Sequence, residues 1–202
     1  MHAYYEQLWA DAPDDPEPWQ WERRRKLLLT EARPGERVLD LGCGAGRFVA
    51  ALQHAGADPV GVEIAPAALE RAARTAPGAD LRLVEPDGSL PLEHGSVDLV
   101  WCSEVLEHVA DTEHLLQEVR RVLRSGGRLL ATVPFHGRVQ AALIGLTRFE
   151  AHFDPTGDHL RFYTRRSLAS ALRSAGLEPE RMRAWGGAPL LRVGLTVWAR
   201  RA

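Results

Sequence analysis

The sequence has almost no lysine and little cysteine. Lys26 is the only lysine, although Lys and Arg together number 25. No other position can therefore supply the lysine needed for Schiff-base catalysis, for the Tyr-x-x-x-Lys pair of short-chain reductases or for a phosphate-binding loop ending in Lys-Ser/Thr. The two cysteines, Cys43 and Cys102, form no CxxC pair and no disulfide framework. We therefore expect a reduced, cytoplasmic protein.

Long hydrophobic runs and a strong net charge are also absent. No run of about 18 apolar residues occurs, which predicts that the chain does not span a membrane. Residues 1–6 lack the basic and then apolar layout of a secretion signal. The net charge is −2, yet residues 161–202 hold nine Arg and two Glu, and nine minus two leaves +7. We interpret this stretch as a solvated basic surface and expect no nucleic-acid partner, although a binding patch for nucleic acid or an acidic substrate is the alternative.

Short apolar segments alternate with helical patterns over most of the chain. The predicted strands are Arg37–Leu41, Asp58–Glu63, Leu81–Val84, Val97–Cys102, Arg128–Val133, Arg181–Trp185 and Leu191–Ala199. The predicted helices are Trp19–Ala32, Arg47–Ala55, one beginning at Pro66, one capped by Asp111 and Arg165–Ala175. This alternation predicts an α/β fold with a Rossmann-like, doubly wound, mostly parallel sheet of about seven strands. The last two strands follow each other without a helix, so we expect an antiparallel last strand, and an N-terminal helical extension precedes the sheet.

The helix after Asp111 carries a clear apolar pattern. Leu115, Val119, Val122 and Leu123 fall at i, i+4, i+7 and i+8, which predicts one stripe packed on the sheet. We expect Ser125-Gly126-Gly127 to end this helix and to lead into the fifth strand.

A glycine-rich turn follows the first strand. It reads Asp40-x-Gly42-x-Gly44-x-Gly46, so its third glycine comes one residue earlier than in the dinucleotide pattern GxGxxG. Glycines are needed where a strand turns sharply into a helix and its backbone must approach a ligand. Glu63 ends the second strand, 63 minus 42 or 21 residues after Gly42. A carboxylate there can accept hydrogen bonds from both hydroxyls of a ribose.

Several ordered motifs resemble those of the class I S-adenosylmethionine-dependent methyltransferases, over about residues 35–135. They are Val38–Gly46, Gly61-Val62-Glu63, Leu90-Pro91, Ser96–Val100 and Ser103–Val109. The resemblance implies S-adenosyl-L-methionine as cofactor and S-adenosyl-L-homocysteine as product. It further implies that Gly42 and Gly44 line the methionine part, that Glu63 holds the ribose and that Ile64 packs against adenine.

The resemblance assigns the remaining predicted cofactor residues by position. Asp40 would order the glycine turn, in which Cys43 and Gly46 also stand, while Cys102 and Ser103 would lie near the sulfonium. Where the family usually places an acid for the adenine amino group, this chain has Pro86, with Glu85 and Asp87 on either side. We choose Asp87 and keep Glu85 as the alternative.

The resemblance also divides the single expected domain, residues 1–202. Residues 1–34 would form a helical lid, 35–133 the cofactor-binding core, 134–163 an acceptor-side insertion, and 164–202 the final helix and edge strands. Aromatic residues of the first part are expected to cover the site, the alternative being simple packing on the sheet: Tyr4, Tyr5, Trp9, Trp19 and Trp21.

Methyl transfer is an in-line displacement in which an enzyme mainly aligns the reactants and excludes water. A general base helps with hydroxyl acceptors. His159 and His136 are our first candidates as base or acceptor ligand, with His152 nearby in sequence; for each, a structural role is the alternative.

A possible metal site needs separate consideration. Glu104, Glu107 and His108 share one helical face by their i, i+3, i+4 spacing. Together with His159 they resemble the divalent-metal site of RNA 3′-end 2′-O-methyltransferases and of certain quinone O-methyltransferases. The same Glu-x-x-Glu-His also occurs in metal-free relatives, and we expect no metal here.

The leading functional hypothesis is methylation of a small-molecule acceptor at oxygen or nitrogen, by a monomer or homodimer. The alternatives are a metal-dependent RNA 3′-end 2′-O-methyltransferase, a nicotinamide oxidoreductase and a non-catalytic cofactor-binding module.

Overall fold

A seven-stranded mixed sheet organises the chain. The computed structural model describes residues 2–11, 17–154 and 157–202, with side chains from Tyr5 onward. The strands are β1 (Arg37–Leu41), β2 (Asp58–Glu63), β3 (Asp80–Leu83), β4 (Val97–Ser103), β5 (Leu123–Pro134), β6 (Leu177–Trp185) and β7 (Gly194–Arg201). Their order in the sheet is β3-β2-β1-β4-β5-β7-β6. The pairs from β3 to β5 are parallel, and β7 is antiparallel to both β5 and β6. The predicted fold class is confirmed.

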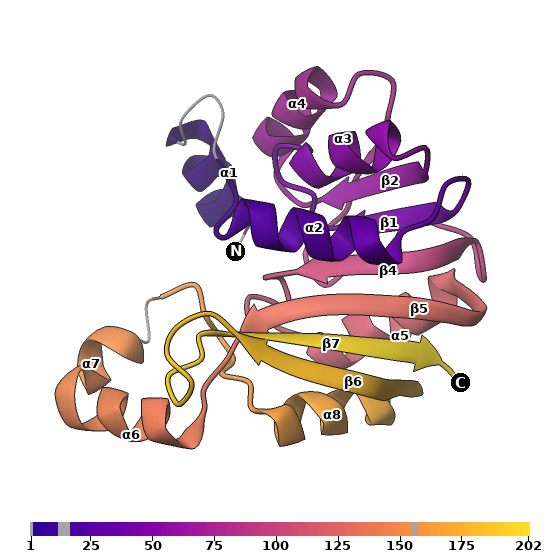
Figure 1. The fold of residues 1–202 in the computed structure, drawn as a ribbon. Coiled ribbons are helices and arrows are strands. Elements are labelled where there is room, and N and C mark those ends of the chain that lie inside the picture. Colours follow the sequence, from indigo (N-terminus) through magenta and orange to yellow (C-terminus); the bar gives the residue numbers. More distant parts are fainter. Residues whose placement is uncertain (1, 12–16, 155–156) are drawn as a thin grey trace.

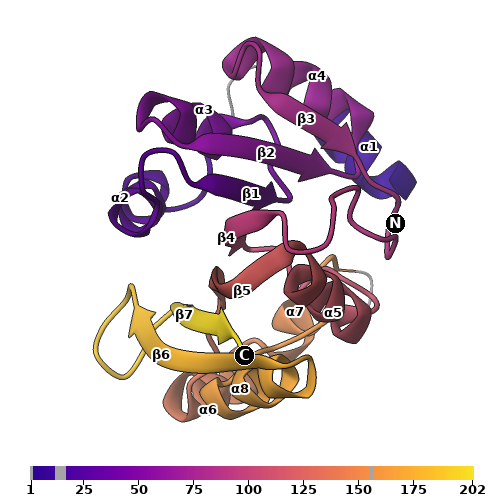
Figure 2. The ribbon, with the colours of Figure 1, turned by 90° about the vertical axis from the view of Figure 1, so that its right-hand side faces the viewer.

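Helices cover both faces of this sheet (Figures 1 and 2). They are α1 (His2–Asp11), α2 (Trp21–Glu31), α3 (Arg47–His54), α4 (Pro66–Thr75), α5 (Thr112–Val122), α6 (Arg138–Thr147), α7 (Phe149–His152) and α8 (Arg165–Ser174). On one face, Leu28 of α2 and Phe48 of α3 pack with Val38, Leu99 and Trp101 of the sheet. On the other face, α5 and α8 close a larger core, in which Leu116 and Leu168 are fully or almost fully buried.

Three elements stand beyond the carboxyl ends of the parallel strands. Figure 1 shows α1 above and α6 and α7 below, all on the side toward which the arrowheads of β4 and β5 point. Ligands of open α/β sheets bind at these strand ends. The helices α6 and α7 lie within residues 134–163, the range that the resemblance assigns to an acceptor-side insertion.

Some element boundaries differ from the prediction. β5 begins at Leu123, directly after α5, because Leu123 already pairs with Val97 of β4. Leu123 is therefore a strand residue. In α5 it is Leu116 that is buried in the core, while Leu115 is half-buried and borders a cavity. β7 begins at Gly194, three residues later than predicted.

None of the helices within the described ranges is both long and apolar enough to cross a membrane. Cys43 and Cys102 are both free and both buried.

Candidate functional site

The glycine turn adopts a backbone that other residues rarely adopt. Gly42, Gly44 and Gly46 have φ values of 75°, 51° and 79°. A Cβ on Gly42 would lie 2.6 Å from Cγ2 of Val105, and one on Gly44 would lie 2.8 Å from Cζ2 of Trp9. A Cβ on Gly46 would lie 2.9 Å from Cβ of Ala72. The three glycines are therefore required both by conformation and by close approach to a neighbouring residue.

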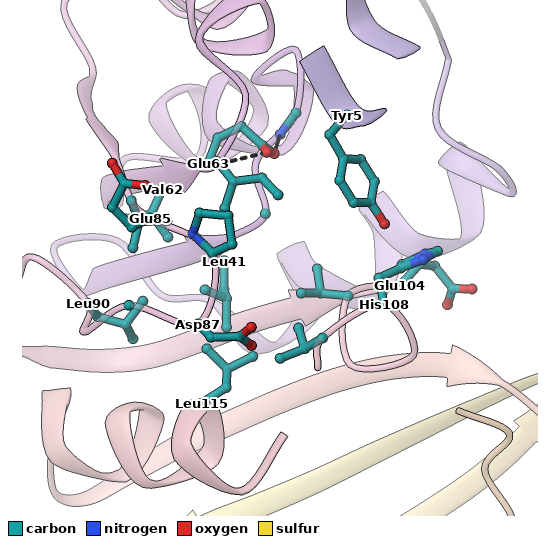
Figure 3. Close-up of a pocket in the computed structure, with 18 of the residues that line it drawn as sticks. Tyr5, Leu41, Val62, Glu63, Glu85, Asp87, Leu90, Glu104, His108 and Leu115 are labelled. Carbon is teal, nitrogen blue, oxygen red and sulfur yellow. Dashed lines mark hydrogen bonds between the residues drawn. The ribbon is translucent and has the colours of Figure 1, made fainter. Parts of the chain in front are cut away.

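Glu63 ties the end of β2 to this turn. Its Oε2 accepts a hydrogen bond from the amide of Gly44 at 3.0 Å (Figure 3). Its Oε1 accepts from the amides of Ile64 at 2.7 Å and Ala65 at 3.2 Å. Burial raises the pKa of Glu63, and these amide hydrogen bonds oppose the rise. Glu63 thus lies beside the glycine turn, and its role in holding a ribose stays a prediction.

A cavity of about 250 Å³ opens above the turn, and we call it the first cavity. Its walls come from α1, from the ends of β1 to β4 and from α5 (Figure 3). Five of the ten predicted cofactor residues border it: Gly42, Gly44, Glu63, Ile64 and Asp87. The other five do not border it: Asp40, Cys43, Gly46, Cys102 and Ser103. No contact with a ligand tests these ten residues, so their binding role remains a prediction.

Both candidate acids for adenine border the first cavity, as does Pro86 between them. Asp87 has φ 55°, and its Oδ1 accepts a hydrogen bond from the amide of Asp111 at 2.9 Å. Glu85 is exposed, and its side chain makes no hydrogen bond within the described ranges. Asp87 thus accepts a hydrogen bond from the residue that caps α5, and Glu85 accepts no such bond. Both residues remain candidates for the partner of the adenine amino group.

Asp40 is a buried carboxyl group directly before the turn. It is 1% exposed, and its Oδ2 has no hydrogen-bond partner among the described residues. Burial raises the pKa of Asp40 to about 8, the Glu63 carboxylate adds to the rise, and Arg24 opposes it. An unpaired acceptor buried next to the turn suits a ligand that brings a cationic or hydrogen-bonding group.

Aromatic residues of the N-terminal segment lie over these strand ends. Tyr5 and Trp9 of α1 border the first cavity, and the ring of Tyr5 meets His108 edge-on at 6.0 Å. Trp19 borders a different cavity, and Trp21 packs on Phe48 in the core. The side chain of Tyr4 falls outside the described residues.

A second cavity of about 400 Å³ adjoins the first and shares Glu104 and His108 with it. The predicted residues His136 and His159 both border it, as does His152. Nε2 of His136 lies 2.8 Å from Nε2 of His152. Burial, followed by the neighbouring His152 and His159, lowers the pKa of His136 to about 4. Burial, followed by His108, also lowers the pKa of His159.

The sequence analysis missed Arg24, which reaches the second cavity from α2. Arg24 is 4% exposed and donates from Nη1 to Oγ of Ser103 at 2.8 Å. That oxygen lies 2.8 Å from Oγ1 of Thr132, which donates to Oε1 of Glu104 at 2.7 Å. Nε of Arg24 has no partner among the described residues. In the sequence, Arg24 stands three residues after Trp21 and four before Leu28, on the apolar face of α2. This position could have indicated that Arg24 is buried.

Three of the four residues considered for a metal come together. Ligand atoms of Glu107, His108 and His159 lie within 4.8 Å of one another. Glu107 is fully buried, and neither of its carboxylate oxygens has a hydrogen-bond partner in the described structure, although Oε1 lies 3.9 Å from Nε2 of His108. Burial followed by Glu104 raises the pKa of Glu107 to about 9. The Glu104 carboxylate is bonded to Thr132. Nitrogen and oxygen donors of this kind can hold a divalent cation, so the expectation of no metal needs an experiment.

Comparison with known proteins agrees with this geometry. The family described as "Methyltransferase domain" matches residues 15–181. An uncharacterised 37.1 kDa protein in transposon TN4556 of Streptomyces fradiae is 41% identical over 54% of the chain, which spans only 33% of that protein. A ubiquinone biosynthesis O-methyltransferase of Xanthomonas axonopodis pv. citri is 31% identical over 85% of the chain and 76% of its own length. The crystal structure of an S-adenosylmethionine-dependent methyltransferase from Mesorhizobium loti superposes with a TM-score of 0.70 at 21% identity, covering 90% of this chain and 97% of that one.

The chain belongs to the class I S-adenosylmethionine-dependent methyltransferases. It is therefore an enzyme of methyl transfer. Membership of this family argues against the nicotinamide oxidoreductase that we kept as an alternative.

Proposed function

We propose that the chain binds S-adenosylmethionine in the first cavity and methylates an oxygen or nitrogen of a small molecule held in the second. The observation that carries this proposal is that the two cavities meet at Glu104 and His108, beyond the end of β4. Two reactants bound on either side of these residues would be neighbours, as an in-line displacement requires.

The first cavity fits the cofactor on structural grounds. The glycine turn would let the backbone approach the cofactor closely, and Glu63, at the end of β2, would hold the ribose. Asp40 lies directly before the turn, and its Oδ2 has no hydrogen-bond partner among the described residues. Glu85 or Asp87 would accept from the adenine amino group, with Ile64 packing on the ring. When bound, S-adenosylmethionine supplies a methyl carbon activated by its sulfonium.

The second cavity supports a small, polar acceptor. Its volume of about 400 Å³ is within the range of small-molecule sites. Seven buried side-chain atoms of the described structure lack a partner, and four of them belong to residues that border this cavity: Nε of Arg24, both carboxylate oxygens of Glu107 and Nδ1 of His136. Unpaired buried groups are costly, so an acceptor with hydroxyl or amine groups would stabilise them. The name of the O-methyltransferase relatives agrees with such an acceptor.

The proton of a hydroxyl acceptor needs a receiver. Burial and the neighbouring His108 lower the pKa of His159, which favours the neutral form that can take that proton. Burial and two neighbouring histidines lower the pKa of His136 to about 4, so this residue is also neutral. The ring of His136, held 2.8 Å from Nε2 of His152, would orient the acceptor. In this account residues 1–34 cover the cofactor, residues 35–133 bind it, and residues 134–163 complete the acceptor side.

One observation favours a second version of this function. The cluster of Glu107, His108 and His159 would let a divalent cation hold the acceptor oxygen, as in the metal-dependent RNA alternative. The oxygens of fully buried Glu107, which accept no hydrogen bond within the described structure, are the feature in its favour.

Transfer of a labelled methyl group from S-adenosylmethionine to a panel of phenols, catechols, amines and short RNAs tests the proposal. We expect product with a small hydroxyl or amine acceptor, unchanged after chelation. The variant Glu107→Gln should lower kcat/KM for that acceptor, and the exposed Glu113→Gln should not. Transfer only to RNA 3′ ends, lost on chelation and restored by one equivalent of a divalent cation, would contradict the proposal and support the alternative.

A further inference from the structure

A groove of about 870 Å³ lies on the sheet face that α2 covers only in part. One wall of the groove is α2, and β6 and β7 form its floor. In Figure 1, α2 lies in front of the sheet, and no helix of the described ranges lies in front of β6 and β7. We call this space the basic groove, because its lining holds six cationic and two acidic side chains, and six minus two leaves +4. The cations are Arg23, Arg24, Arg25, Lys26, Arg181 and Arg183, and the acids are Glu22 and Glu31.

The helix and the strand present their cations toward the same space. Arg23 and Lys26 stand at i and i+3 in α2, so they are neighbours on its surface. Arg183 and Trp185 are two residues apart in β6, so their side chains point to the same face of the sheet. The guanidinium of Arg23 lies 5.6 Å from the centroid of a Trp185 ring, which brings the wall and the floor together.

Both acids of the basic groove are already paired. Oε2 of Glu22 lies 3.0 Å from Nη2 of Arg25. Oε1 of Glu31 lies 3.4 Å from Nη2 of Arg181 and accepts a hydrogen bond from Nε1 of Trp198 at 2.8 Å. These two pairs leave the other cations of the groove without an acidic partner in its lining.

Three exposed cations therefore remain for a ligand. The side chains of Arg23, Lys26 and Arg183 are exposed and make no ion pair or hydrogen bond within the described ranges. Charges of one sign that line a concave site concentrate counter-ions there. Guanidinium and ammonium groups both bind phosphate oxygens through charge-assisted hydrogen bonds. The basic groove thus offers a site for an anion with more than one charged group.

The groove favours a small anion over a nucleic acid. Its volume is within the range of small-molecule sites. Nucleic-acid sites combine a strongly basic surface with aromatic faces on which bases stack, and this chain has a net charge of −2. Trp185 is buried, and the guanidinium of Arg181 lies 3.7 Å from the ring centroid of Trp198. Neither ring therefore offers a free face for a base.

The basic groove adjoins the second cavity. Arg24 borders both spaces. Trp19 borders the second cavity, Trp185 borders the groove, and their rings lie 5.2 Å apart. An anion in the groove would therefore lie beside a molecule in the second cavity.

We propose that the basic groove binds a small ligand that carries two or more phosphate groups, held by Arg23, Lys26 and Arg183. These phosphates have two possible sources. They belong to a remote part of the acceptor, which rests on the proposed function, or to a separate ligand bound beside the acceptor.

Titration calorimetry with inorganic diphosphate tests the groove without using catalysis. We expect the full-length protein to bind diphosphate more tightly than orthophosphate, with an affinity that falls as salt rises. The double variant Lys26→Gln with Arg183→Gln should bind diphosphate at least about tenfold more weakly, because two charge-assisted contacts are lost. Arg166→Gln is the matched control and should bind like the wild type. Arg166 is also exposed and without a partner among the described residues, but it lies on α8, which covers the other face of the sheet.

Methyl-transfer assays distinguish the two sources. Each acceptor of the panel is compared with a derivative that carries a remote diphosphate. A higher kcat/KM for the derivative, lost in the double variant, assigns the phosphates to the acceptor. No such preference, with diphosphate binding retained, assigns them to a separate ligand.

Four results would overturn the proposal. They are no diphosphate binding by the wild type at about 0.15 M salt, diphosphate binding no tighter than that of orthophosphate, equal weakening in Arg166→Gln and the double variant, and tighter binding of single-stranded RNA or polyglutamate that the double variant loses. The last result would make the groove a surface for a macromolecule. An unchanged thermal unfolding midpoint shows that the double variant is folded. Calorimetric binding of S-adenosylmethionine by the wild type reports separately on the proposed function.

Discussion

Replacing Asp40 with asparagine should stabilise the cofactor-free protein and weaken cofactor binding. Asp40 is 1% exposed, and burial followed by repulsion from Glu63 raises its pKa from 3.8 to about 8. Between those two values the folded protein holds a proton that the unfolded chain has released. The free energy of unfolding therefore falls as pH rises through this range, by about 1.4 kcal/mol per pH unit. An asparagine side chain does not titrate, so this slope should disappear in the variant.

The magnitude follows from the same shift. A pH of 7 lies 7 minus 3.8, or 3.2 units, above the pKa of Asp40 in the unfolded chain. The free energy of unfolding that Asp40 has cost the wild type by pH 7 is therefore about 4 kcal/mol, at roughly 1.36 kcal/mol per unit. At pH 5 the corresponding figure is about 2 kcal/mol. We expect Asp40→Asn to exceed the wild type in unfolding free energy by up to these amounts, with the gap widening as pH rises.

Urea unfolding followed by tryptophan fluorescence at pH 5, 6 and 7 measures this gap. Asp58→Asn is the control, because Asp58 is an exposed carboxylate on the neighbouring strand β2. A gap that stays constant from pH 5 to pH 7 would refute the reasoning, since Asp40 would then be ionised in the folded state. Calorimetry on the same variant should show S-adenosylmethionine binding weakened by about tenfold or more, because a cationic ligand near the turn would favour the ionised form of Asp40, a form that asparagine cannot adopt.

Three further changes test other parts of the site. Gly44→Ala places a methyl group against Trp9 at a left-handed φ of 51°, and should shift the Trp9 fluorescence and weaken cofactor binding in a titration by about tenfold; unchanged binding would show that the turn tolerates a side chain. Arg24→Met should lower kcat/KM for the acceptor by about tenfold or more with the Kd of S-adenosylmethionine unchanged, whereas half-exposed Arg25→Met should do neither; equal losses in both would remove Arg24 from the acceptor site. The pKa of His136 is lowered to about 4, so protonation of this residue should not reduce kcat/KM between pH 6 and pH 8. The wild type and His136→Gln should therefore have parallel pH profiles in this range. A fall in kcat/KM near pH 6.5 that vanishes in the variant would show that His136 becomes protonated there.

The parts of the fold that could be predicted rest on short-range patterns. Alternating apolar segments identified each strand, and the missing helix before the last strand predicted its antiparallel pairing with β6. The closeness of the glycine turn to Glu63 follows because parallel neighbouring strands end at the same edge of the sheet, but their hydrogen bond was not predicted.

Other features depend on contacts between distant segments. Burial of Arg24 requires Ser103, 79 residues away in the chain, so α2 alone looks like an ordinary partly buried helix. The predicted stripe of α5 was largely right, since Val119 and Val122 are fully buried and Leu115 packs against the same core. The prediction missed Leu116, and Leu115 also borders the first cavity. The helix α6 was not predicted, although Val139, Leu143 and Leu146 stand at the helical spacing i, i+4 and i+7.

The central claim is that the glycine turn and Glu63 bind S-adenosylmethionine, and calorimetry tests it most directly. S-adenosylmethionine, S-adenosylhomocysteine and NAD are titrated into the wild type, Glu63→Ala and Glu70→Ala, the last removing an exposed carboxylate of α4. We expect the first two ligands to bind the wild type and Glu70→Ala, to lose affinity at least about a hundredfold in Glu63→Ala, and NAD not to bind. Full affinity in a folded Glu63→Ala, or no binding by the wild type, would contradict the account.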